Sequence, residues 1–191
     1  MSIQPKAAAP QTAATIVEAR DLSKVFSMRV GLRASASKRY VRAVDRVSLK
    51  IGRGEIVGLV GESGCGKSTL GRLLIRLETP TAGSVFFESR DITRLSGSSL
   101  RRTRSGMQII FQDPASSLNP RFTVRDTLTE AIRAHRSKLK KRELNAHMAA
   151  LLQMVGLPVA ALDRYPREFS GGERQRIAIA RALAVNPRFI V

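Results

Sequence analysis

The sequence predicts an α/β fold, on the evidence of three features of its apolar pattern. Residues 56–60 form a short, continuous apolar run between two glycines, which is typical of a buried parallel strand. Leucines at positions 70, 73, 74 and 77 then recur at helical spacing and should pack one face of a helix against the sheet. Residues 84–87 and 107–111 are further strand candidates.

The remaining elements follow from local signals along the chain. Residues 1–15 resemble a disordered lead-in, and strand signals at 16–17 and 43–51 flank a basic stretch at 27–40 that reads as a solvated loop. Apolar residues from 123 to 155 recur at helical spacing and predict a helical subdomain. Ser170 is a good N-cap for a helix over about 173–184, and residues 189–191 begin another apolar run.

The composition is that of a folded protein with an excess of positive charge. Hydrophobic residues make up 43% of the 191 residues, which is enough for one core. Lys and Arg outnumber Asp and Glu by 33 to 15, for a net charge of +18. Such an excess favours nucleic acid, anionic lipid or another polyanion as a partner, but it also follows if acidic residues lie in a missing part of the chain, which we favour.

Cysteine usage and hydropathy predict a cytoplasmic protein. The single cysteine, Cys65, excludes an intrachain disulfide. No apolar run approaches the roughly 20 residues that span a bilayer, and the first residues lack the apolar core of a signal peptide.

A glycine-rich turn at residues 61–68 carries the strongest functional signal. It fits the pattern of glycine, any four residues, glycine, lysine, then serine or threonine, and it lies between the predicted strand and helix. In that setting backbone N–H groups converge on phosphate oxygens at the positive end of a helix dipole. We expect Lys67 to reach the β and γ phosphates of a nucleotide and Ser68 to bind Mg²⁺. The predicted nucleotide-binding residues here are Gly61, Glu62, Ser63, Gly64, Cys65, Gly66, Lys67, Ser68 and Thr69.

Cys65 lies inside this turn, where N–H groups and Lys67 could make its thiol reactive. The alternative, which we favour, is that a small residue simply fits there.

A second motif resembles the signature sequence of ABC ATPases, usually written LSGGQxQR. It begins at Phe169 and reads FSGGERQR, and the sequence that follows it is similar to the family's usual continuation. Gln112, in IIFQDP, matches the glutamine that this family carries between the two motifs. The resemblance implies a P-loop NTPase (RecA-like) core with N-terminal antiparallel β strands and an inserted α-helical subdomain, the core being incomplete in this chain.

The same resemblance divides the chain and assigns further roles. It implies a partial ABC domain over 16–191, with a core at 16–112, a helical subdomain at 113–170, and the signature helix and the start of a strand at 171–191. Phe26 matches the position where the family stacks an aromatic ring on adenine, although a core role for Phe26, or Tyr40 as the stacking ring, stays open.

The family mechanism implies that two domains pack head to tail. Residues Ser170, Gly171, Gly172 and Glu173 of one chain would contact ATP held by Lys67 of the other, so that ATP closes the dimer and hydrolysis releases it. Gln112 would touch Mg²⁺ and the attacking water.

Residues 112–124 most resemble the ATP-binding subunits of oligopeptide and dipeptide importers. This implies a peripheral protein on the cytoplasmic face of the inner membrane. Its implied partners are a second ATPase subunit, identical or different, and permease subunits that dock around residues 116–121. A substrate-binding protein is an indirect partner, and no nucleic acid partner is expected.

The match has departures. Phe169 and Glu173 replace the family's leucine and glutamine, and the Asp-Glu pair expected after the strand at 189–191 does not occur. We therefore expect a C-terminally truncated chain that binds ATP weakly at best, from a full-length parent that hydrolyses it. Asp113 is assigned to a turn before Pro114 rather than to metal, and His135 and His147 fall too early to sense the γ-phosphate.

Two other functions stay open at this point. A soluble ABC ATPase of DNA repair or translation is favoured by the positive charge, although it usually has two cassettes or long coiled-coil insertions. A nucleotide-binding module without turnover is favoured by the missing carboxylates.

Overall fold

The computed structural model describes residues 14–30, 37–113, 117–134 and 139–191. It divides into two compact units, residues 1–101 and 102–191. Residues 1–13 of the predicted lead-in lie outside the described residues, and Thr15 already begins the first strand.

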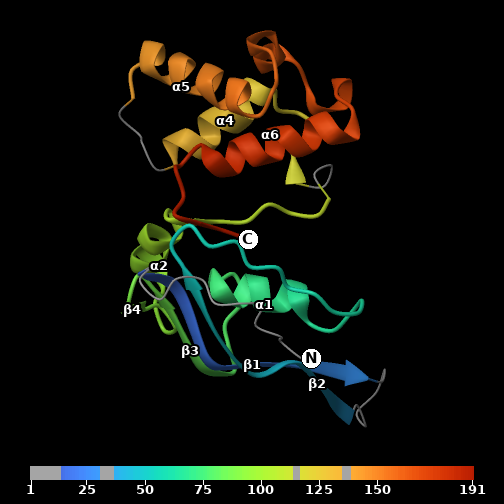
Figure 1. The fold of residues 1–191 in the computed structure, drawn as a ribbon. Coiled ribbons are helices and arrows are strands. Elements are labelled where there is room, and N and C mark those ends of the chain that lie inside the picture. The colour runs from blue at the N-terminus through green and yellow to red at the C-terminus, as the bar shows by residue number, and fades with distance from the viewer. Residues whose placement is uncertain (1–13, 31–36, 114–116, 135–138) are drawn as a thin grey trace. The chain divides into compact units, whose positions relative to one another are not determined.

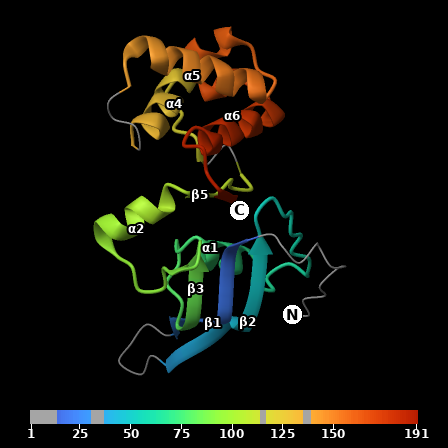
Figure 2. The ribbon, with the colours of Figure 1, turned by 60° about the vertical axis from the view of Figure 1, so that its left-hand side comes forward.

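A four-stranded antiparallel sheet forms the first unit (Figures 1 and 2). Its strands are β1 (Thr15–Val30), β2 (Ser37–Gly52), β3 (Ala82–Phe87) and β4 (Arg90–Asp91), in the order β2-β1-β3-β4. The prediction of a loop over 27–40 is wrong at both ends of that stretch, which are strand residues. Ser27 pairs with Tyr40 and Met28 pairs with Arg39 in the β1–β2 ladder. Polar and basic side chains are compatible with strands whose backbone groups are paired on the neighbouring strand.

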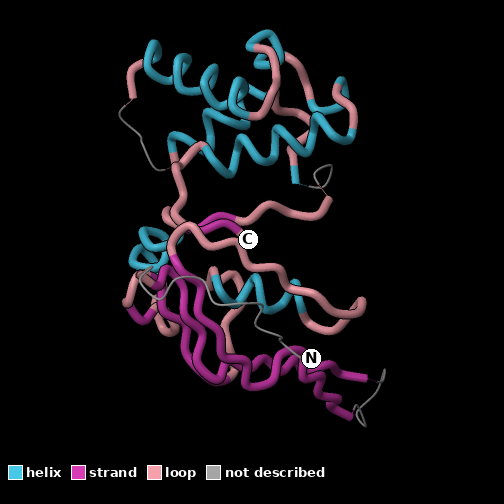
Figure 3. Tube along the Cα trace, in the orientation of Figure 1, coloured by secondary structure: helices cyan, strands magenta, loops and turns pink. Residues whose placement is uncertain are grey.

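The buried strand predicted at 56–60 does not form. Residues 55–62 have no regular secondary structure (Figure 3), and the side chains of Ile56 and Val60 are 98% and 85% exposed. A parallel strand is stable only when neighbouring strands pair with it and layers cover both faces. No strand of the described residues pairs with 56–60, so the apolar pattern alone is insufficient there.

Helix α1 (Lys67–Leu74) follows the glycine-rich turn and lies against β1 and β2. Leu70, Leu73 and Leu74 are buried as their spacing predicted, whereas Leu77 lies beyond the helix end and is 44% exposed. Just past the helix, Arg76 is buried, and its Nε donates to the Ile92 carbonyl at 3.0 Å. This hydrogen bond ties the end of α1 to the segment after β4 and satisfies a buried polar group.

The second unit is a helical cluster with a short parallel strand pair. Helix α2 (Gly97–Arg104) crosses the boundary between the units. Strands β5 (Met107–Gln108) and β6 (Phe189–Ile190) pair in parallel, and the Ile110 N–H extends the pairing by donating to the Val191 carbonyl at 2.8 Å. The strand predicted at 107–111 is therefore correct in place but shorter than predicted.

Three helices of this unit pack on one another: α4 (Val124–Arg133), α5 (Lys141–Met154) and α6 (Gly171–Leu183). Two 3₁₀ helices, η1 (Val159–Asp163) and η2 (Pro166–Glu168), connect α5 to α6. The helical positions predicted to be apolar are confirmed as buried, and they are Val124, Leu128, Ile132, Leu144, Met148, Leu151 and Leu152. This apolar core holds α6, and hence its N-terminus, in place.

Two methionines of α5 give a direct test of this packing. Met148 is 1% exposed and Met154 is 68% exposed. We expect Met148→Ala to lower the free energy of unfolding by about 2–5 kcal/mol, because it leaves a cavity in the core. Met154→Ala, the matched control, should change it by no more than about 0.5 kcal/mol. Urea denaturation followed by circular dichroism measures both, and equal effects would contradict the described packing.

Candidate functional site

The glycine-rich loop approaches the sheet backbone more closely than any side chain would permit. Gly66 has φ +97° and is the N-cap of α1. A Cβ atom at Gly66 would lie 2.1 Å from the carbonyl oxygen of Ala43 in β2, well inside van der Waals contact. Gly64, with φ +79°, also lies in the left-handed region that favours glycine. The loop can therefore turn into the helix only because these positions lack side chains.

Lys67 folds back over this loop from the first residue of α1. Its ammonium donates to the carbonyl oxygen of Gly61 at 2.7 Å and to that of Glu62 at 2.6 Å, and it lies 3.6 Å from the sulfur of Cys65. The loop is exposed over residues 61–64, so a ligand can reach it. A lysine charge held at an exposed loop, at the N-terminus of a helix, is suited to binding phosphate.

Cys65 is half-buried within the loop. A Cβ atom at Gly61 would lie 2.7 Å from its sulfur, so the two residues pack closely. This contact supports the packing interpretation of Cys65. The remaining predicted residues, Ser68 and Thr69, lie in the first turn of α1, where the Ser68 side chain is exposed.

The two candidate stacking rings lie on neighbouring strands of the hairpin. Phe26 in β1 pairs with Val41, is half-buried, and has the ammonium of Lys24 at 4.8 Å from its ring centroid. Tyr40 in β2 is 66% exposed. Both rings remain candidates, and Phe26 stays a prediction.

Gln112 belongs to the second unit and is exposed. It was expected at the end of a strand, but β5 ends at Gln108 and the chain continues to Gln112 without regular structure. Ser116, at the start of the predicted docking segment 116–121, lies outside the described residues. The role of Gln112 in binding metal and water stays a prediction.

The signature segment begins α6 with a reciprocal cap. The Glu173 N–H donates to Ser170 Oγ at 3.3 Å, and the Ser170 N–H donates to a carboxylate oxygen of Glu173 at 2.8 Å. The predicted N-cap is thus confirmed, although the helix begins at Gly171, earlier than predicted. Glutamate and glutamine both make this capping box, so Glu173 can cap the helix at the position where the family has glutamine.

Open space surrounds the two glycines of this segment. A Cβ atom at Gly171 would meet nothing within 4 Å, and one at Gly172 would reach only the guanidinium of Arg176, at 4.0 Å. Their backbone at the start of α6 is therefore accessible to an anion. The hydrogen bond from the Ser170 N–H, with the nearby charges of Arg164 and Arg176, holds the pKa of Glu173 below its usual value, so a negative charge stands beside this accessible backbone.

Two arginines that the sequence analysis missed anchor the segment before α6. The Arg164 guanidinium lies 4.3 Å from the centroid of the buried Phe169 ring, and Arg174 donates to the Phe169 carbonyl at 2.6 Å. Phe169, the other departure from the signature, is therefore part of the helical core. No motif marks this pair of contacts, since each depends on the folded path of residues 164–174.

His147 serves the helical unit rather than a ligand. Its Nε2 lies 3.1 Å from the carbonyl oxygen of Ala184 at the end of α6, and His135 lies outside the described residues. Among the described residues, no group of three or more His, Cys, Asp or Glu side chains could hold a metal ion. No described helix has the length and hydropathy needed to cross a membrane.

The capping glutamate predicts a pH dependence. Since the pKa of Glu173 is lowered on folding, its contribution to stability is present above the unfolded-state value and is lost as pH falls through the folded value. Glu173→Gln keeps the box but removes this titration. When the pH is lowered from neutral to below about 4, we expect the midpoint of thermal unfolding to fall less for the variant than for the unmodified chain. Equal losses would show that Glu173 is not held in the capping box.

Comparisons with known proteins agree with this geometry. The family model described as ABC transporter matches residues 44–191. The chain is 49% identical over 178 residues to the oligopeptide transport ATP-binding protein AppF of Bacillus subtilis, covering 93% of this chain and 54% of that protein. It is 46% identical to the dipeptide transport ATP-binding protein DppF of Lactococcus lactis, covering 92% of this chain and 55% of that protein. The chain therefore spans about half the length of these relatives.

Among solved structures, the chain is similar to the dimeric ATP-binding cassette MJ0796 in a post-hydrolysis state with ADP and Pi. The TM-score is 0.79 at 29% identity, covering 92% of this chain and 72% of that one. The predicted α/β class and cassette fold are thereby confirmed. The chain belongs to the ABC transporter family.

Proposed function

We propose that this chain is the ATP-binding, energy-coupling part of an ABC importer for oligopeptides or dipeptides. The observation that carries the proposal is the position of Lys67, whose ammonium is bonded to the carbonyls of Gly61 and Glu62 at the start of α1. Negatively charged oxygens would accept stronger hydrogen bonds from the Lys67 ammonium than these two neutral carbonyls do. ATP phosphates would replace them.

The loop supplies the other requirements for holding a triphosphate. Because Gly66 is the N-cap of α1, the N–H groups of the first turn of the helix lie at the end of α1 that adjoins the loop. No acidic residue occupies that first turn, so the positive end of the helix dipole is not offset there. Ser68 would hold Mg²⁺ together with Gln112, and the metal would neutralise charge on the β and γ oxygens.

Ser170, Gly171, Gly172 and Glu173 are proposed to act in trans. Their accessible backbone at the N-terminus of α6 would contact the γ-phosphate that a partner chain holds with Lys67. ATP binding would then close a head-to-tail dimer, and hydrolysis would reopen it. The similarity to MJ0796, whose described state is a dimer with ADP and Pi, supports this arrangement.

The relatives support peptides as the transported substrate. Proteins named for oligopeptide and dipeptide transport match more than nine-tenths of this chain at 46–49% identity. The proposed partners are a second ATPase subunit and permease subunits in the membrane, with a substrate-binding protein as an indirect partner. The proposed place is the cytoplasmic face of the inner membrane, and hydrolysis is proposed for the whole protein. These relatives do not favour a role in DNA repair or translation.

Binding of MgATP by the 191-residue chain tests the central part of the proposal. We expect Lys67→Ala to weaken binding of a fluorescent ATP analogue by about tenfold or more, because a charged hydrogen-bond donor to the phosphates is lost. Lys50→Ala is the matched control, since Lys50 is exposed in the same unit and pairs with Glu18. Equal affinities of the Lys67→Ala variant and the unmodified chain would overturn the assignment.

A further inference from the structure

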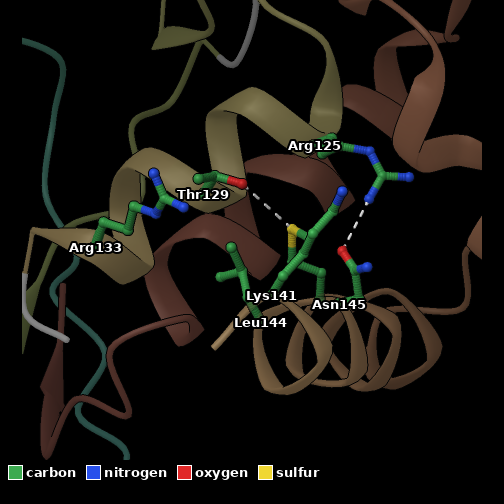
Figure 4. Close-up of a pocket in the computed structure, with 7 residues that line it drawn as sticks. Arg125, Thr129, Arg133, Lys141, Leu144 and Asn145 are labelled. Atoms are coloured by element: carbon green, nitrogen blue, oxygen red, sulfur yellow. Dashed lines mark hydrogen bonds between the residues drawn. The ribbon is translucent and has the colours of Figure 1, made fainter. Parts of the chain in front are cut away.

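A cavity of about 500 Å³ opens between α4 and α5 in the helical unit (Figure 4), and none of the residues assigned above to nucleotide binding lines it. Both helices belong to the same unit and pack on each other, so the cavity does not depend on how the two units are placed. Its lining consists of Arg125, Thr129, Arg133, Lys141, Leu144, Asn145 and Met148.

The charged residues that line the cavity are all positive. The lining contains three cations and no acidic residue. Arg125 is already paired, because its Nε donates to Asp163 at 2.8 Å and its Nη1 donates to the Asn145 side-chain oxygen at 3.2 Å. Arg133 and Lys141 form no ion pair with any residue in the described part of the chain. Two exposed positive charges in the lining therefore have no counter-charge among the residues that the structure describes.

The position of Lys141 adds to this imbalance. Lys141 is the first residue of α5, where the helix dipole disfavours a cation. The local acidic residue, Glu143, does not relieve it, because its carboxylate accepts from the Lys140 N–H at 3.1 Å in the N-terminal cap. The interaction of the Lys141 charge with the dipole of α5 is therefore unfavourable. A ligand with negative charge would benefit from this lysine.

Hydrogen-bonding groups in the lining are mainly donors. The Thr129 hydroxyl donates to the sulfur of Met148 at 3.6 Å, and a thioether is a weak acceptor. The Asn145 oxygen is already used by Arg125, which leaves the Asn145 amide group as a donor. Together with Arg133 and Lys141, these donors match a group that carries several acceptor oxygens. Leu144 and Met148 supply an apolar wall beside them.

We propose that this cavity binds the phosphate group of a ligand that also has an apolar part. A phosphate offers more acceptor oxygens than a carboxylate, and so it can accept from more of the donor groups that line the cavity. The ligand is either a phospholipid headgroup or a soluble phosphate ester. This site shares no residue with the glycine-rich loop, and its cations are part of the net charge of +18.

Two assays on the full chain distinguish these sources, both in a Lys67→Ala background so that the glycine-rich loop does not contribute. Flotation compares vesicles containing phosphatidylglycerol with vesicles of phosphatidylcholine alone. Calorimetry measures binding of hexyl phosphate, a soluble phosphate ester that has an apolar part. Arg133→Gln combined with Lys141→Gln removes the two unpaired charges. The matched control, Arg142→Gln combined with Arg167→Gln, removes the same charge from exposed residues outside the cavity.

We expect the cavity variant to lose about tenfold or more in affinity, and the control variant to lose much less, since only the first removes direct phosphate donors. Thr129→Val, which removes one donor at nearly constant volume, should weaken binding by a smaller factor and gives a second test if the double variant folds poorly. Binding to vesicles alone identifies a lipid headgroup, and binding in both assays identifies a soluble phosphate ester as well. Absence of binding in both assays, or equal losses in the cavity and control variants, would overturn the proposal.

Discussion

The close approach of Gly66 to β2 is the constraint on which the proposed nucleotide site depends. With φ +97°, Gly66 ends the loop and begins α1 while its α-carbon faces the Ala43 carbonyl, where an added Cβ would come within 2.1 Å. Lys67 is the next residue, so the same geometry allows its side chain to turn back over residues 61 and 62. The buried face of α1 then fixes the loop on the sheet through Leu70, Leu73 and Leu74.

The two helix N-termini that the proposed function uses have different electrostatics. Helix α1 has no acidic residue in its first turn and no side-chain cap, so its dipole and Lys67 act together on a bound anion. Helix α6 has Ser170 and Glu173 in a reciprocal cap, and Glu173 stays ionised to lower pH than usual. An anion at α6 would therefore meet a nearby negative charge as well as open backbone N–H groups. This difference fits a primary phosphate site at α1 and a weaker contact in trans at α6.

Local signals in the sequence predicted the features that depend on neighbouring residues. The leucine spacing predicted the buried face of α1, and Ser170 predicted the N-cap of α6, because both arise within one or two turns of helix. The apolar periodicity of 123–155 likewise predicted which side chains of α4 and α5 are buried. The glycine, lysine and serine pattern of 61–68 predicted the loop in which Gly66 and Lys67 have their described geometry.

Strands were predicted less well, because a strand depends on a partner elsewhere in the chain. The run at 56–60 has the composition of a buried strand but no partner among the described residues, while the polar stretch at 37–40 pairs with β1. The contacts of Arg76, Arg164 and Arg174 were also unpredictable, since each binds a carbonyl or a ring that only the tertiary fold brings near. The cavity between α4 and α5 was missed for the same reason.

The ammonium group of Lys67 gives the most direct test of the proposed contact with the ATP phosphates. Nuclear magnetic resonance of the chain with ¹⁵N-labelled lysine side chains would follow this group during a titration with MgATP, with the Lys67→Ala spectrum giving the assignment. We expect the Lys67 signal to shift with MgATP but not with adenosine, because phosphate oxygens replace the carbonyls of Gly61 and Glu62 as partners of the ammonium group. A Lys67 signal that stays unchanged while MgATP is shown to bind would contradict the proposed contact.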